Sequence, residues 1–132
     1  MKKELITYAE YGHMLSELVT MIKDSRYFLE DIKLIYTFMR GGLPMAVHLS
    51  HFLNLSIVID GLQDDRFPLI AEETLVVDDI ADTGKTLYGY QKCPIATLFY
   101  KPRSIVKPTF YVRETTNWIV FPWEKVDEIP NR

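Results

Sequence analysis

The sequence lacks the features that define disulfide-rich, membrane-spanning and secreted proteins. It has one cysteine, Cys93, among 132 residues, so no disulfide can form within the chain, and we expect a buried thiol in a reducing compartment. No apolar run reaches the roughly 18 to 20 residues of a membrane span. The two lysines near the start are followed by acids and tyrosines instead of an apolar signal segment. These absences predict a cytoplasmic protein without a membrane partner.

The chain also lacks an excess of positive charge. Fifteen Lys and Arg residues stand against eighteen Asp and Glu residues, for a formal net charge of −3. General nucleic-acid binders carry a basic surface, so this balance disfavours nucleic acid as a partner. Hydrophobic residues make up 48% of the chain, enough for one core, and there is no internal repeat or linker. We therefore expect a single domain over residues 1–132.

Apolar strands alternate with helices along the chain. Residues 7–23 are predicted to be a helix, opened by a capping box of Thr7 and Glu10. A second helix is predicted over 43–53, with Pro44 in its first turn. Strands are predicted at 32–38, 55–59, 74–80, 95–100 and 109–112, and a short helix after Gly84. This order predicts an α/β fold with a central, mostly parallel sheet flanked by helices.

The most informative stretch is residues 75–87, LVVDDIADTGKTL. A buried strand delivers two adjacent carboxylates, Asp78 and Asp79, at its carboxyl end, where open α/β sheets bind ligands. A turn of small and hydroxylated residues follows, and the backbone N–H groups at the start of a helix bind phosphate. Carboxylates for hydroxyls or a metal, beside a phosphate-binding turn, indicate a site for a phosphorylated sugar.

Other interpretations of this stretch are weaker. Gly84-Lys85-Thr86 occurs in P-loops, but that motif needs a glycine where this chain has Asp79. Apolar residues before two acids also occur in nucleotide hydrolases, yet no phosphate loop precedes them here. As a purely structural strand end, the stretch would bring three acids close together without a use for their charge.

The stretch VVDDIADTGKTL resembles the phosphoribosyl-pyrophosphate signature of type I phosphoribosyltransferases, and it fits at every position. Residues 38–44, FMRGGLP, resemble the family's pyrophosphate loop. Lys101-Pro102 and residues 118–124, WIVFPWE, resemble the base-binding end of the bacterial xanthine–guanine enzymes. The resemblance covers residues 33–124 and implies the fold of that family, with a small hood built from the C-terminal segment.

The resemblance also implies a reaction. Enzymes of this family displace pyrophosphate from C1 of phosphoribosyl pyrophosphate with a ring nitrogen of a base, and Mg²⁺ bridges the pyrophosphate and the ribose hydroxyls. The implied activity is a purine phosphoribosyltransferase that salvages guanine, xanthine or hypoxanthine, as a homodimer or homotetramer. The alternative is a non-catalytic protein of the same fold that binds a phosphoribosyl compound or a nucleotide and regulates a partner.

Each residue that matches the family acquires an implied role. Asp78 and Asp79 would face the ribose hydroxyls, with Asp79 as the metal ligand. Asp82 would contact N7 of a purine as the acid–base group; the other interpretation is that it only caps the following helix. The implied 5′-phosphate-binding residues are Asp82, Thr83, Gly84, Lys85 and Thr86.

The remaining implied roles concern pyrophosphate and the base. Arg40 and Gly41 would bind pyrophosphate, at a peptide bond that is often cis in the family. Lys101 would donate to the 6-oxo group, which favours an oxopurine over adenine. Trp118 would lie over the purine ring, unless it belongs to the core, and the Ile119 backbone would reach the 2-position.

Some features depart from the family or stand outside it. Residues 60–73 are shorter than the family's lid and have neither its Ser nor its Tyr, which favours slow turnover or the non-catalytic alternative. Arg66 in this segment is either a phosphate clamp or an exposed arginine. Val120 stands where the xanthine–guanine enzymes have an acid. His48 and His51 have a spacing that suits a metal but no evident third ligand.

Overall fold

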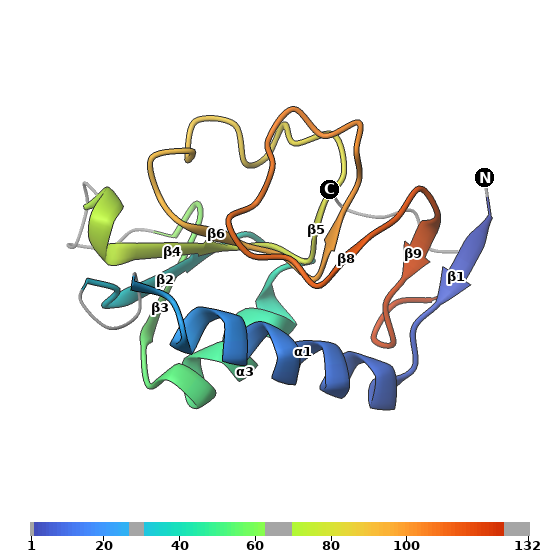
Figure 1. Ribbon diagram of the computed structural model, residues 1–132, viewed down its shortest axis with the longest axis horizontal. Coiled ribbons are helices and arrows are strands. Elements are labelled where there is room, and N and C mark those ends of the chain that lie inside the picture. Colours follow the sequence, from blue (N-terminus) through green and yellow to red (C-terminus); the bar gives the residue numbers. More distant parts are fainter. Residues whose placement is uncertain (1, 27–30, 63–69, 126–132) are drawn as a thin grey trace.

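The computed structural model describes residues 2–26, 31–62 and 70–125. Its main sheet has four parallel strands in the order β3-β2-β4-β6. These strands are β2 (Leu34–Thr37), β3 (Ser56–Ile59), β4 (Thr74–Val77) and β6 (Ile95–Ala96). Helices α1 (Tyr8–Lys23) and α3 (Leu43–Leu53) lie together under one face of this sheet (Figure 1). The predicted parallel α/β fold is confirmed.

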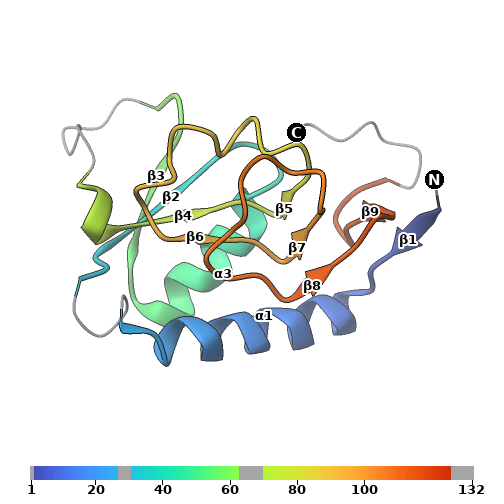
Figure 2. The same ribbon diagram turned by 45° about the horizontal axis from the view of Figure 1, so that its top comes forward.

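Two smaller parallel sheets complete the fold. One has the order β5-β7-β8, and the other pairs β1 with β9. Their strands are β5 (Ile80–Ala81), β7 (Phe99–Tyr100), β8 (Arg113–Glu114), β1 (Lys3–Leu5) and β9 (Trp118–Val120), and a 3₁₀ turn, η1 (Ala71–Glu73), precedes β4. Figures 1 and 2 show β5 and β8 between the main sheet and the β1–β9 pair, which lies at one end of the molecule. The C-terminal segment thus forms a small unit beside the main sheet.

The two long predicted helices form where the sequence places them. Thr7 Oγ1 accepts a hydrogen bond from the Glu10 N–H at 3.0 Å, and Glu10 Oε1 accepts one from the Thr7 N–H at 3.2 Å. This capping box satisfies two N–H groups that the first turn of α1 would otherwise leave open. Helix α3 carries Pro44 in its first turn and ends at Asn54, whose left-handed backbone has a φ of 57°.

The two faces of the main sheet are covered differently. On one face, α1 and α3 bury apolar side chains such as Leu18 and Leu49 against the strands. On the other face, the covering side chains, including Leu87, Cys93 and Val106, come from irregular segments. The expected buried thiol is confirmed, and burial raises the pKa of Cys93, with a smaller contribution from the negative charge of Glu72. Within the described ranges, no helix has the length and apolar character needed to cross a membrane.

Three predicted elements differ from the structure. The strands predicted at 74–80 and 95–100 are each divided, with Asp78-Asp79 between β4 and β5 and residues 97–98 between β6 and β7. The strand predicted at 109–112 is wrong, since Phe110 makes only an isolated bridge and the strand forms at β8.

The short helix predicted after Gly84 is also wrong, because this stretch forms turns. Gly84 and Gly89 have φ values of 84° and 102°, which lie outside the helical region. The residues between these two glycines are too few for a helix to propagate.

We expect Leu49→Ala to lower the free energy of unfolding by about 2–5 kcal/mol, because it opens a cavity between α3 and the sheet. Leu49 is fully buried, whereas Leu62, the matched control, is 51% exposed. Leu62→Ala should change the free energy of unfolding by less than about 0.5 kcal/mol. Urea denaturation of the two variants checks this, and equal losses would contradict the assigned core.

Candidate functional site

Two carboxylates occupy the break between β4 and β5. Asp79 is 1% exposed and Asp78 is 8% exposed. Asp78 Oδ1 accepts a hydrogen bond from the Asp79 N–H at 2.9 Å, and Asp79 Oδ1 accepts one from the Ile80 N–H at 2.8 Å. The main chain at Asp78 remains hydrogen-bonded to β6, because the Asp78 N–H donates to Ala96 O at 3.2 Å. The break therefore holds two carboxylates in fixed positions at the carboxyl edge of the sheet.

The loop after β2 packs directly against these carboxylates. A Cβ on Gly41 would lie 2.7 Å from Asp79 Oδ2, and a Cβ on Gly42 would lie 2.5 Å from Thr37 Oγ1. Both distances are shorter than a real Cβ tolerates, so the approach of the loop requires glycine at these positions. The peptide bond before the exposed Arg40 is cis, as the resemblance implies. The structure thus brings Gly41 next to Asp79.

The chain turns sharply after β5. A small pocket is lined by Asp78 and by residues 80–87, which include the predicted set Asp82, Thr83, Gly84, Lys85 and Thr86. Thr83 Oγ1 accepts a hydrogen bond from the Lys85 N–H at 3.3 Å, and Gly84 O accepts one from the Tyr88 N–H at 2.9 Å. Because no helix begins here, anion binding at this place depends on the N–H groups and hydroxyls of the 82–87 turn.

A second loop, residues 101–106, packs against the 82–87 turn and is hydrogen-bonded to it. The Lys101 N–H donates to Ala81 O and the Ile105 N–H donates to Thr83 O, each at 2.9 Å. A Cβ on Gly84 would lie 2.6 Å from Ser104 Oγ and 2.9 Å from the Ile105 N. The two loops are therefore in close backbone contact, and Gly84 is required both for that contact and for its positive φ.

Two cations meet the Asp82 carboxylate. Lys101 Nζ lies 3.5 Å from Asp82 Oδ1, and the lysine side chain is only 5% exposed. Arg103 donates to the same oxygen through Nε at 2.9 Å and through Nη2, with its side chain 55% exposed. Asp82 itself is 20% exposed. The structure thus joins two residues that the sequence singled out, Asp82 and Lys101.

Arg103 was not predicted from the sequence. It lies 21 positions after Asp82, a separation that no local pattern connects. Its position two residues after Lys101 was the only available signal.

Trp118 and Ile119 lie on β9, which pairs with β1 instead of with the strands that carry the other site residues. Trp118 is partly buried, and its backbone N–H donates to Lys2 O at 2.8 Å. Ile119 is 1% exposed and belongs to the core on the helix side. The neighbouring Val120 is buried as well, at 5% exposure. Trp118 is therefore the β9 residue with side-chain surface left to offer a ligand.

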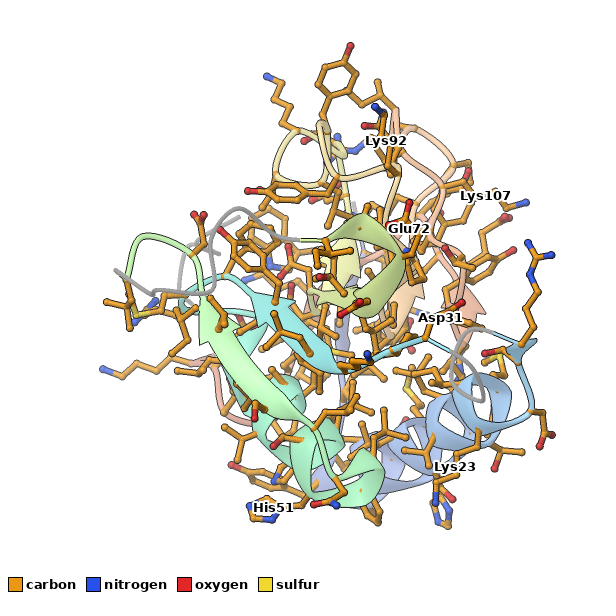
Figure 3. The ribbon with its side chains drawn as sticks, turned by 90° about the vertical axis from the view of Figure 1, so that its left-hand side faces the viewer. Lys23, Asp31, His51, Glu72, Lys92 and Lys107 are labelled. Atoms are coloured by element: carbon orange, nitrogen blue, oxygen red, sulfur yellow. The ribbon has the colours of Figure 1, made fainter. Side chains whose placement is uncertain are left out.

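The histidines of α3 lie on the helix side of the molecule. His48 Nδ1 is hydrogen-bonded to Tyr11 OH at 2.6 Å. His51 projects from α3 at the side of the molecule opposite Lys92 and Lys107, which belong to irregular segments (Figure 3). Among residues 2–26, 31–62 and 70–125, no three His, Cys, Asp or Glu side chains are grouped to hold a metal by themselves. Arg66 and most of the shortened lid, residues 63–69, lie outside the described residues.

The arrangement offers three kinds of interaction at one edge of the sheet. Buried carboxylates can accept hydrogen bonds from sugar hydroxyls or bind a cation. The 82–87 turn can bind an anionic group, and the ammonium of Lys101 can donate to a carbonyl beside Asp82. A ligand with a phosphate, a sugar and a carbonyl-bearing ring would meet all three.

The chain is similar to several known proteins, although no family model matches it. It is 28% identical over 117 residues to the xanthine-guanine phosphoribosyltransferase of Idiomarina loihiensis, which covers 72% of this chain and 73% of that protein. The xanthine-guanine phosphoribosyltransferase of Cereibacter sphaeroides is 29% identical over 64% of this chain and 65% of its own length.

Solved structures extend the similarity to the whole chain. The purine phosphoribosyltransferase of Pyrococcus horikoshii superposes with a TM-score of 0.81 and 30% identity over 100% of both chains. The xanthine-guanine-hypoxanthine phosphoribosyltransferase of Helicobacter pylori has a TM-score of 0.74 over 92% of this chain and 91% of its own. At 23% identity, this second match supports the fold alone.

We expect Gly84→Ala to lower the free energy of unfolding by more than about 1–2 kcal/mol, the cost of a left-handed backbone for a residue with a Cβ. Crowding against Ser104 and the Ile105 N adds to that cost. Gly12→Ala is the matched control, because nothing lies within 4 Å of its Cβ position and it is in the middle of α1. That change should raise stability by about 0.5–1 kcal/mol. Opposite signs in thermal denaturation are the expected result.

Proposed function

Since this chain belongs to the purine phosphoribosyltransferase family, we propose that it transfers the 5-phosphoribosyl group from phosphoribosyl pyrophosphate to a 6-oxopurine, giving the nucleotide and pyrophosphate. The observation that carries this assignment is the pairing of Asp82 with the buried Lys101, beside two carboxylates at the carboxyl edge of the sheet. A protein that only bound the sugar phosphate would need neither side chain at these positions. Guanine, hypoxanthine and xanthine are the proposed acceptors.

In the proposed complex, the sugar phosphate lies between the two loops and the acids. The 82–87 turn binds the 5′-phosphate through its backbone N–H groups and the hydroxyls of Thr83 and Thr86. Asp78 and Asp79 accept hydrogen bonds from the ribose hydroxyls, and the N–H groups of Asp79 and Ile80 hold one oxygen of each carboxylate in place. Arg40 and the N–H of Gly41 bind the pyrophosphate.

The base is bound by Lys101 and by residues of β9. Lys101 donates a hydrogen bond to the 6-oxo group, and the indole of Trp118 lies over the purine ring. The Ile119 backbone meets the 2-position. As the bond from C1 to the pyrophosphate oxygen breaks, a ring nitrogen of the purine forms the new bond to C1 with its own electron pair. Asp82 takes the proton from N7, and pyrophosphate leaves with the electrons of the broken bond.

A divalent metal fits this set of residues. Mg²⁺ in phosphate-binding enzymes is held by one or two carboxylates together with oxygens of the substrate. Asp79 Oδ2 faces the space beside Gly41, where any side chain would lie within 2.7 Å of it. Asp79 is the proposed ligand of the ion, with Asp78 beside it. When bound, the ion offsets the negative charge that develops on the leaving pyrophosphate.

The proposal includes a location and an assembly. A single buried cysteine and an acidic balance of charges suit a reducing cytoplasm. Members of the family are commonly dimers or tetramers, and a homodimer or homotetramer is proposed here on that ground. Purine salvage is the corresponding physiological role.

The direct test is nucleotide formation by the purified protein with Mg²⁺, phosphoribosyl pyrophosphate and each of guanine, hypoxanthine, xanthine and adenine. We expect turnover with an oxopurine, and a loss of about 100- to 10,000-fold in kcat for Asp82→Asn, because the amide cannot take the proton from N7. No helix follows Asp82, so the interpretation of this residue as a helix cap is wrong. If its ion pairs with Lys101 and Arg103 served stability alone, the variant would keep its rate and lose about 1 kcal/mol of stability. Binding of phosphoribosyl pyrophosphate in calorimetry without turnover of any purine would instead support the non-catalytic regulatory protein.

Lys101→Met tests how the base is chosen. The variant keeps the apolar stem in its buried position but removes the ammonium that would donate to the 6-oxo group. The ratio of kcat/KM for guanine over adenine should fall by about 10- to 100-fold, the worth of one hydrogen bond from a charged donor.

The matched control is Lys107→Met, whose exposed ammonium lies 5.8 Å from the ring centroids of Tyr100 and Tyr111. The control should leave the ratio unchanged. A ratio equally unchanged in Lys101→Met would exclude Lys101 from base selection.

A further inference from the structure

All the hydrogen bonds and ion pairs that Asp82 makes with described side chains converge on one of its two carboxylate oxygens. Arg103 Nε donates to Oδ1 at 2.9 Å, Arg103 Nη2 donates to the same atom, and Lys101 Nζ lies 3.5 Å from it. One edge of the carboxylate is therefore held by two cations, and its orientation is set from that edge.

We infer that Arg103 is a positioning residue for Asp82: its guanidinium holds Oδ1 so that Oδ2 is presented to the N7 proton of the purine. This inference rests on the proposed function, in which Asp82 takes that proton. Arg103 itself touches no reacting atom in this scheme. Its contribution is made through the direction in which the carboxylate points.

Arg103 is held in place from both sides of its own loop. The Ser104 N–H donates to Lys101 O at 2.9 Å, and the Ile105 N–H donates to Thr83 O at 2.9 Å. The guanidinium therefore starts from a fixed backbone that is bonded to the residue immediately after Asp82. A planar guanidinium has its N–H groups in a rigid arrangement, so a fixed backbone gives it a defined direction toward its acceptor.

The two cations make different contacts with Asp82. A separation of 3.5 Å for Lys101 Nζ is longer than an ordinary hydrogen bond, so this ammonium acts on Asp82 mainly through its charge. Arg103 makes the directional hydrogen bonds. The interaction of Lys101 with Asp82 therefore needs no directed N–H group. In the proposed complex, the ammonium can donate a hydrogen bond to the 6-oxo group of the base.

A half-exposed ion pair of this kind adds only about 0–1 kcal/mol to stability. Arg103 therefore contributes little to the free energy of unfolding. A loss of turnover without a loss of stability in an Arg103 variant would show that the residue positions Asp82. Arg103 side-chain exposure is 55%, so its replacement leaves the core intact.

The experiment compares Arg103→Met, Arg103→Lys and the matched control Arg113→Met, which alters an exposed arginine on β8. We expect Arg103→Met to lower kcat with an oxopurine by roughly 10- to 100-fold, the usual cost of removing a group that orients a functional residue, with an unchanged KM for phosphoribosyl pyrophosphate. Arg103→Lys should recover part of the loss, because it restores charge without the fixed pair of N–H groups. Arg113→Met should behave as the wild type.

A double-mutant cycle shows whether Arg103 acts through Asp82. In the Asp82→Asn background, Arg103→Met should have no further effect on kcat, since there is no carboxylate left to orient. Losses that multiply in the double variant, or a wild-type kcat in Arg103→Met, would overturn the positioning role while leaving the proposed function in place. A wild-type protein without turnover of any oxopurine would reject the proposed function first, and the positioning role with it.

Discussion

The fold of this site depends on the way two buried carboxylates are accommodated in the middle of a strand. Asp78 and Asp79 each place one oxygen on the N–H of the following residue, so the chain can leave the sheet after β4 and rejoin a strand at β5. Burial of charge is costly unless hydrogen bonds compensate it, and these local bonds provide part of that compensation. Every other part of the site is built around this break, including the glycine loop that closes on Asp79 and the turn that follows β5.

Local patterns predicted the parts of the structure whose physics is local. The capping box, the helical spacing of apolar residues and Pro44 located α1 and α3, and the signature around Asp78 located the acidic strand end. The same reasoning placed a helix after Gly84 where turns occur, because it did not anticipate that Gly84 and Gly89 would both adopt positive φ. It also predicted single strands where the structure has β4 and β5, and β6 and β7. An apolar run does not show where hydrogen bonding passes from one sheet to the next.

The pairings between distant segments could not be predicted from spacing. Nothing in the local sequence connects Asp82 with Arg103, or the first strand with β9, since these contacts arise only when the chain has folded. Asp82 and Lys101 were singled out through a resemblance to a family, whereas their approach to 3.5 Å comes from the parallel pairing of β5 with β7. The structure therefore adds to the sequence a geometry in which one carboxylate serves as the meeting point of two loops.

The backbone bond between Ile105 and Thr83 also has a thermodynamic consequence. It connects the 82–87 turn to the loop that carries Lys101, so ordering one of them restricts the motion of the other. In the proposed complex, a phosphate bound by the turn would therefore lower the entropic cost of binding a base beside Lys101. By linkage, the base would strengthen binding of the phosphate by the same factor. This main-chain hydrogen bond is thus a route by which the two halves of the proposed site can be coupled, independently of any lid that covers them.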